Sequence, residues 1–266
     1  MNAKQIASRF DEMGARVKLN LMPGITRGFR IDIQKDTDGE FFDLRVPEHP
    51  AGVMGVSVLQ VQPKDRHLLL LVRHTAPRKQ VDRFLCGHDE REWFVAAVPG
   101  GASSVAQAKL ALKPALVREA EAQNELTARQ RNRRKNRAFR RQGEWFFVPV
   151  RSLTIDPKLI LKDEPIRRGS GKPHWVEELY RTGGTRVYVN HSHPNGLTEK
   201  EYQALLRRKP AASSSSWRVM QRDPLVYARG TVRHFDHATI TLPDWHRVVM
   251  NTETQSRSMR NMAFLD

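Results

Sequence analysis

A dense run of basic side chains between residues 128 and 141 is the feature of this sequence best suited to chemistry. Eight of these fourteen residues are Arg or Lys and none is acidic. They are Arg129, Arg131, Arg133, Arg134, Lys135, Arg137, Arg140 and Arg141. Arginine presents a planar fork of donors that pairs with phosphate through two parallel hydrogen bonds. The run therefore predicts a site that binds the phosphates of a nucleic acid.

The same stretch, TARQRNRRKNRAFRRQ from Thr127 to Gln142, resembles the arginine-rich RNA-binding motifs of viral and phage regulatory proteins. In those motifs a short helix folds as it enters a widened RNA groove. The resemblance is compositional, and it implies a helix of roughly four turns and RNA ahead of DNA as the ligand. The alternative is a solvated helix face, but such a face usually places Glu four residues from Arg to relieve repulsion.

The distribution of charge supports the same interpretation. The chain has 266 residues and a formal net charge of +16, of which residues 128 to 141 contribute +8. Positive charge that is so localised favours nucleic acid over an acidic protein or an anionic membrane as the partner. Because the run contains only Ala128, Ala138 and Phe139 as apolar residues, we expect no insertion into a membrane.

Further basic residues form a second tier of candidate phosphate contacts in the second half of the chain. They are Arg167, Arg168, Lys172, Arg207 and Arg208. Aromatic residues are interleaved with this charge, and we expect two or three of them to face solvent and stack on unpaired bases. The aromatic candidates are Trp145, Phe146, Phe147, Trp175, Tyr180, Tyr188, Trp217, Tyr227 and Trp245.

Histidines give a different class of hypothesis, a metal-dependent hydrolase or nuclease. Six of the ten histidines follow residue 170: His174, His191, His193, His234, His237 and His246. Neutral imidazole is the commonest metal ligand, and three of these rings could converge with Asp236 or Asp244. Histidines at strand ends also act simply as hydrogen-bonding groups. The sequence therefore assigns no metal ligand, no cofactor and no catalytic residue.

The string VYVNHSHP, from Val187 to Pro194, resembles part of the metal-binding core of the JAMM metalloproteases. That family places Ser and Asp at fixed offsets beyond the proline, where this chain has Tyr202 and Leu205. The departure removes two of the required groups, so we do not assign that activity.

The string Arg233-His234-Phe235-Asp236-His237 is similar in its histidine content to HNH-type nucleases. Those sites need a helix after the hairpin, whereas residues 238 to 250 alternate as strands do. We therefore expect Asp236 and His237 to form a hairpin turn.

Other features limit the class of protein. The single cysteine, Cys86, can form neither an internal disulfide nor a thiolate zinc site. No window approaches eighteen consecutive apolar residues, and the N-terminal residues lack the layout of a signal peptide. We expect a cytoplasmic protein.

The elements that must position these residues follow from hydrophobic periodicity. A helix is predicted over 2–13 and seven strands over 16–22, 29–34, 41–46, 56–61, 67–73, 82–86 and 92–98. Short turns between the strands predict an antiparallel meander or barrel-like domain at 1–118 that the helix caps. Helical spacing follows over 103–126, interrupted by Pro114, and 119–142 is predicted as a basic helical connector.

The remaining residues, 143–266, predict a smaller and irregular antiparallel α+β domain, so the fold class is α+β. Strands are expected at 144–150 and 185–190, a loop at 163–173 and a helical turn at 175–181. Thr198 and Glu201 have the spacing of a capping box for a helix to Arg208. A closing antiparallel sheet follows, with Gly230 as a bulge.

These observations lead to one preferred function and two alternatives. We predict a non-enzymatic RNA-binding protein, a subunit of a ribonucleoprotein or of an RNA-guided assembly that includes other proteins. The first alternative is the metal-dependent hydrolase or nuclease. The second is an adaptor that uses its arginines against an acidic protein.

Overall fold

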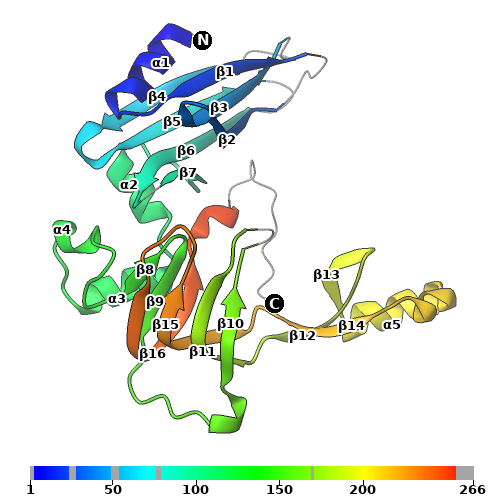
Figure 1. Cartoon of the computed structure of the whole chain (residues 1–266). Coiled ribbons are helices and arrows are strands. Elements are labelled where there is room, and N and C mark those ends of the chain that lie inside the picture. The colour runs from blue at the N-terminus through cyan, green and yellow to red at the C-terminus, as the bar shows by residue number, and fades with distance from the viewer. Residues whose placement is uncertain are drawn as a thin grey trace. The chain divides into compact units, whose positions relative to one another are not determined.

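The computed structural model describes residues 3–23, 28–48, 54–75, 79–90, 92–168 and 171–255. It divides into two compact units (Figure 1). Unit 1 holds the described residues up to Arg118 together with 251–255, and unit 2 runs from Glu119 to Met250. Both combine helices with mostly antiparallel sheets, which confirms the α+β class. Within the described residues, no helix is long and apolar enough to cross a membrane.

Unit 1 contains strands at all seven predicted segments. Its elements are α1 (Ala3–Glu12), β1 (Val17–Met22), β2 (Arg30–Asp36), β3 (Gly39–Pro47), β4 (Met54–Gln62), η1 (Pro63–Asp65), β5 (His67–His74), β6 (Gln80–Asp89), β7 (Glu92–Ala97), α2 (Val105–Ala111), the first half of α3 (Ala115–Gln123) and η4 (Thr252–Gln255). Pro114 separates α2 from α3, as predicted.

The strands of unit 1 form two sheets, and among the described residues no ladder closes them into a barrel. One sheet has the order β1-β3-β2, and the other is the meander β4-β5-β6-β7. β1 pairs with β3 in parallel, which an antiparallel meander does not allow. The barrel prediction was wrong here because alternation indicates which side chains face the core but not which strands pair. Ile6 and Phe10 of α1 are buried in the core of this unit.

Unit 2 is built around a six-stranded antiparallel sheet of order β10-β11-β15-β16-β9-β8. The elements of the unit are α4 (Ala128–Arg131), β8 (Arg140–Gln142), β9 (Trp145–Pro149), η2 (Pro157–Leu159), β10 (Leu161–Ile166), β11 (His174–Thr182), β12 (Thr185–Asn190), β13 (His193–Thr198), α5 (Glu199–Arg208), η3 (Pro210–Ser214), β14 (Arg218–Arg222), β15 (Leu225–Arg233) and β16 (Ile240–Met250). Its core is made by residues of one sheet face, including Trp145, Phe147 and Leu179.

The six-stranded sheet is strongly curled. Nδ1 of His174, at the start of β11, lies 2.8 Å from Oε1 of Gln142 on β8. These strands are four places apart in the sheet, so the sheet must bend back on itself for the two side chains to meet. The amide nitrogen of Gln142 also donates to the carbonyls of Val232 and Ala238. Gln142 therefore holds the curled sheet together at one end.

A smaller sheet of order β13-β12-β14 forms an arm with α5 (yellow in Figure 1). The predicted capping box is confirmed, since Thr198 and Glu201 bond reciprocally at the start of α5. The ring of Tyr202 stacks on Tyr188 with centroids 4.2 Å apart, and it meets Trp217 edge-on. These rings attach α5 to the arm.

Two predictions for unit 2 were wrong. Residues 175–181 lie in strand β11, and the predicted loop at 163–173 begins within strand β10. A register shift between Val176 and Glu178 puts Val176 and Leu179 on the same core face at a spacing of three, which imitates a helix. β10 contains Pro165, which is tolerated because β10 is an edge strand. The bulge at Gly230 is confirmed by the register shift beside it.

Candidate nucleic-acid interface

The basic run does not form the predicted helix. Only Ala128–Arg131 is helical, as α4, residues 132 to 139 form a loop, and Arg140–Gln142 is strand β8. We call residues 128 to 141 the arginine loop. A capping box of Thr127 and Gln130 starts α4. Eight like charges would repel one another along one helix, and asparagine favours turns over helix interiors, so the helix ends at Asn132.

The arginine loop is ordered by its own hydrogen bonds. Oδ1 of Asn136 accepts from the backbone N–H groups of Ala138 and Phe139, at 2.8 and 3.0 Å. The backbone N–H of Asn136 donates to the carbonyl of Phe139. Phe139 is buried and packs edge-on against Phe146 of β9, with ring centroids 5.2 Å apart. The loop is therefore folded and anchored without a ligand.

Four basic side chains of the loop are exposed and unpaired. Arg129, Arg133, Lys135 and Arg137 form neither a side-chain hydrogen bond nor an ion pair with any residue that the structure describes. Their charges are therefore available to an external anion.

The other four basic side chains of the loop make contacts within the protein. Nε of Arg131 donates to the carbonyl of Leu126, and Nη1 of Arg140 donates to the carbonyl of Thr241. Arg141 donates from Nε to the carbonyl of Gly143 at 2.8 Å. Arg134 and Arg140 are half-buried like Arg141. These four residues support the loop, whereas the four unpaired cations extend from it.

Burial changes the titration of the two inner arginines. Desolvation, together with the positive charge of Arg141, lowers the pKa of Arg134 to about 10. Desolvation also lowers the pKa of Arg141, and the charge of Glu144 partly offsets it. The Arg134 guanidinium stays protonated at neutral pH, so it adds to the positive potential at the base of the loop.

The second tier of predicted cations is divided between the sheet and the arm. Arg207 and Arg208 are exposed in the last turn of α5, where the helix dipole stabilises positive charge. Figure 1 shows α5 well apart from α4 and β8, so the structure does not bring this pair to the arginine loop. Arg167, which is exposed, and Arg168, which is half-buried, follow β10.

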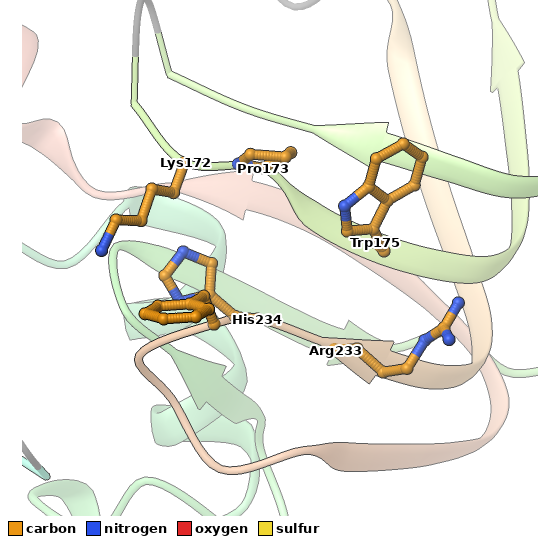
Figure 2. A pocket seen from close by; sticks show the side chains of 6 residues that line it. Lys172, Pro173, Trp175, Arg233 and His234 are labelled. Carbon is orange, nitrogen blue, oxygen red and sulfur yellow. The ribbon is translucent and has the colours of Figure 1, made fainter.

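A pocket of about 730 Å³ opens beside the loop that joins β15 to β16 (Figure 2). It is lined by Lys172, Pro173, Trp175, Arg233, His234 and Phe235. Trp175 and Arg233 are cross-strand partners on β11 and β15, so they project from the same sheet face. Trp175 is 42% exposed and Phe235 is 82% exposed. Two large rings are thus accessible beside a guanidinium group.

The cations of the pocket already have partners. Nζ of Lys172 lies 2.7 and 2.9 Å from the two carboxylate oxygens of Asp236, which is buried. The same ammonium lies 4.8 Å from the centroid of the Phe235 ring. Arg233 pairs with Asp163 at 2.7 Å, but both side chains are more than half exposed, so water screens this pair. Lys172 thus positions Phe235, and Arg233 can exchange its partner for another anion.

The sheet face that carries Trp175 continues as alternating rings and cations. The guanidinium of Arg229 lies 4.7 Å from the ring centroid of Trp245, and that of Arg247 lies 5.3 Å from Tyr227. Tyr227 in turn stacks on Tyr180 with centroids 6.0 Å apart. Trp245 is buried and Arg229 also pairs with Glu178. The half-buried Tyr180 and Tyr227 beside Arg247 are therefore the part of this face where rings and positive charge meet, as in sites for single-stranded nucleic acids.

Three of the predicted histidines come together at the end of the curled sheet. Ring nitrogens of His174, His234 and His237 lie within 4.8 Å of one another. His234 stacks on His174 at 4.1 Å and on His237 at 4.6 Å, centroid to centroid. Desolvation and the neighbouring rings lower the pKa of His237 to about 4 and also lower that of His234. These two rings are therefore neutral at pH 7.

The hydrogen bonds of the cluster assign protons to two of its rings. Because the amide nitrogen of Gln142 donates to two carbonyls, its oxygen must accept, so Nδ1 of His174 carries a hydrogen. Nδ1 of His234 accepts from the backbone N–H of Asp236 at 3.1 Å. That contact occupies the lone pair of one His234 nitrogen. His174 keeps Nε2 directed toward Glu144, 3.7 Å away.

The other predicted histidines have separate roles. His191 lies in the turn between β12 and β13, and His193 stacks on Trp217 of the arm. His246 is buried on β16 and contacts the carbonyl of Asp244. Residues 240 to 250 form one strand, without the helix of an HNH site. Asp236 and His237 lie in the connection between paired strands β15 and β16, as predicted.

Sequence reasoning missed Phe235 and Arg233. Among the nine aromatic candidates, only Trp175 is exposed, at 42%, and the others are buried or half-buried. Phe235 is the only apolar residue of the His-Phe-Asp-His turn. A phenylalanine in a polar hairpin turn has no strand neighbour to cover it, and that signal could have identified it.

Comparison of the chain with protein-family models, with curated proteins and with solved structures found no match. The function is therefore inferred from the chemistry of the site.

Proposed function

We propose that this protein binds RNA without catalysing a reaction, and that the arginine loop is its main phosphate contact. The observation that carries the proposal is a set of exposed side chains on a folded loop, Arg129, Arg133, Lys135 and Arg137, which have no partner among the described residues. Four cations within nine residues repel one another, and a polyanion relieves that repulsion while releasing its own counterions. Since the loop is already ordered, little conformational entropy is lost on binding.

RNA is proposed ahead of DNA because rings as well as cations are accessible in unit 2. Single-stranded loops and bulges of RNA present bases that can leave the stack and lie on aromatic side chains. Arg167 and Arg168 follow β10, next to the residues that lead into the pocket, and they would extend the phosphate contacts. We also propose that the protein works in a ribonucleoprotein or RNA-guided assembly, with unit 1 contacting protein partners.

The test is a comparison of two variants with equal loss of charge. The first replaces Arg129, Arg133, Lys135 and Arg137 with Gln. The control replaces Arg30, Lys35, Lys64 and Arg73, which are exposed residues of unit 1, with Gln. Binding of a fluorescently labelled RNA is measured by anisotropy at 0.15 M salt. We expect the first variant to lose affinity on the order of a hundredfold and the control to lose less than threefold. Equal losses in both variants would contradict the proposal.

The histidine cluster supports a second candidate, a metal-dependent hydrolase or nuclease. Three ring nitrogens and the Glu144 carboxylate lie close together, and His174 bonds a second-sphere amide as metal-bound histidines do. Against it, the rings stack face to face and one nitrogen of His234 accepts a backbone hydrogen bond.

Metal analysis of the purified protein separates the two candidates. Stoichiometric zinc or manganese that is lost in His174→Ala or His237→Ala would favour the hydrolase. Metal-free protein with undiminished RNA affinity would favour the binder. Competition by a polyanion against an acidic peptide for the arginine loop tests the remaining adaptor hypothesis.

A further inference from the structure

We infer that the pocket between Trp175 and Phe235 receives an unpaired nucleobase, so the RNA bound at this place is single-stranded. This inference rests on the proposed RNA-binding function and adds a second site to it. The pocket lies in unit 2, as does the arginine loop, but it is built from different elements, β11, β15 and the β15–β16 loop.

Both rings of the pocket are exposed to solvent. A phenylalanine that is 82% exposed leaves most of its apolar surface in water, which a folded domain normally avoids. Trp175, at 42% exposure, is accessible on the sheet face beside it. Covering these rings with a flat aromatic ligand would recover the hydrophobic contribution of both.

Phe235 is held in place by a contact with Lys172. Its ring lies under the ammonium group of Lys172, and Lys172 is bound by both oxygens of the buried Asp236. The backbone of Asp236 is fixed in turn by its hydrogen bond to His234. A ring with so little freedom loses little entropy when a base stacks on it.

Arg233 supplies positive charge at the pocket. Within the part of the chain that the structure describes, Arg233 is held only by its exposed pair with Asp163, and a phosphate can replace that carboxylate. Trp175 and Arg233 are directly opposite on neighbouring strands, so the ring and the cation are adjacent. The base and the phosphate of one nucleotide could therefore contact them together. A volume of about 730 Å³ is in the usual range of small-ligand pockets and has room for a base and its sugar.

A regular duplex does not match the exposed rings of the pocket. Bases inside a double helix already have both faces stacked, so they cannot lie on a side chain of the protein. An exposed ring on the sheet face and a second on the adjoining loop are matched by a base that has left its stack. The neighbouring rings and cations of the same face, Tyr227, Arg229 and Arg247, would guide the adjoining strand.

The test compares three labelled ligands of equal length: a single-stranded RNA, the same strand with abasic sites at its central positions, and the duplex. The variants are Trp175→Ala, Phe235→Ala and the conservative Trp175→Phe. Leu159→Ala, which removes a 54% exposed apolar side chain elsewhere in unit 2, is the matched control. Thermal unfolding confirms that each variant folds.

We expect each alanine variant to bind the single strand roughly tenfold to a hundredfold more weakly and the duplex unchanged. Trp175→Phe keeps a ring and should lose less than threefold, and the abasic strand should bind wild type as poorly as the intact strand binds Trp175→Ala. If both alanine variants keep wild-type affinity while the arginine-loop variant loses it, the pocket inference is overturned and the proposed function stands. If wild type binds none of the three ligands, both are overturned.

Discussion

The paired cations of one sheet in unit 1 and the outer cations of the arginine loop use positive charge in opposite ways. In unit 1, Arg16, which precedes β1, and Lys18 of β1 both bind Asp36 at 2.7 Å, and Arg45 binds the buried Asp43 at 2.6 Å. Arg16 and Lys18 thus pair with the end of β2, whereas Arg45 and Asp43 pair within strand β3. Basic composition alone therefore does not identify a binding site.

In the arginine loop the supporting bonds come from Asn136, from buried Phe139 and from the four arginines that contact the protein, so the other four cations are not needed to hold the fold. Those four therefore have no partner among the residues that the structure describes. Four changes to the protein test this difference. They disorder the arginine loop, pair its charges with added acids, replace a neighbouring histidine, and remove the acid that pairs with two cations of unit 1.

Removing the anchor of the loop should have the largest effect. Phe139→Ala leaves a cavity next to Phe146 and should lower the free energy of unfolding of unit 2 by about 3–5 kcal/mol. Because the net charge is unchanged, any loss of RNA affinity measures how much the order of the loop contributes to binding. We expect the affinity to fall at least tenfold. Chemical denaturation and anisotropy measure the two effects. Unchanged affinity in a folded variant would mean that charge alone suffices.

Giving the loop acids of its own should make it resemble unit 1. Gln130→Glu keeps the capping box of α4, since glutamate can replace glutamine there, and Asn132→Asp adds a second carboxylate at an exposed position. The double variant should bind RNA about tenfold more weakly at 0.15 M salt, with an unchanged unfolding midpoint. The neutral double variant Gln130→Ser with Asn132→Ser separates the added charge from the lost amides. Equal affinities in the two double variants would contradict the electrostatic account.

The histidine stack should make unit 2 sensitive to acid. The pKa of His237 is lowered to about 4 in the folded state, against about 6.5 when unfolded, so the unfolded state binds more protons between these values. Stability is therefore complete above pH 6.5 and is lost as pH falls toward 4. We expect a loss of roughly 1–2 kcal/mol between pH 7.5 and 5 from this residue, discounted for its partial exposure. Thermal unfolding of wild type and His237→Gln at both pH values measures it, and an equal pH dependence in the two proteins would refute the assignment.

Unpairing charge in unit 1 should have the smallest effect. Hydrogen bonds from Arg16 and Lys18 hold the pKa of Asp36 well below its usual range, so the pairing is lost only in acid, as pH falls below about 4. Asp36→Asn should lower the unfolding midpoint slightly at pH 7 and by less at pH 2. It frees two cations far from the proposed site in sequence, and RNA affinity should change less than twofold. A larger gain would show that any unpaired cation of this chain binds RNA.

The sequence predicted those elements whose local pattern agrees with their tertiary role. Alternation from Val17 to Leu21 predicted β1, and the spacing of Thr198 and Glu201 predicted the start of α5, because both signals depend on neighbours in the chain. Pairing order and curl depend on distant residues. The bond between His174 and Gln142 joins segments 32 positions apart, and no local pattern shows it.

The candidate site was predicted in part for the same reason. The eight basic residues were evident from composition, but composition could not separate the four unpaired cations from Arg131, Arg134, Arg140 and Arg141, which contact the protein. Which cations contact the protein depends on the loop conformation. Repulsion between neighbouring charges and the bonds from the Asn136 side chain to backbone groups favour that loop over a helix. Trp175 was among the predicted rings, whereas its partner across the strand, Arg233, depends on the register of β11 and β15.

The most direct test of the central claim is the salt dependence of RNA affinity. Four phosphate contacts predict a slope of log affinity against log salt of roughly −3 to −4, and any contact at the pocket makes it steeper. Replacing Arg129, Arg133, Lys135 and Arg137 with Gln should flatten that slope by about 3, while replacing Arg30, Lys35, Lys64 and Arg73 should leave it unchanged. A wild-type slope near −1, or the same slope in all three proteins, would contradict the account.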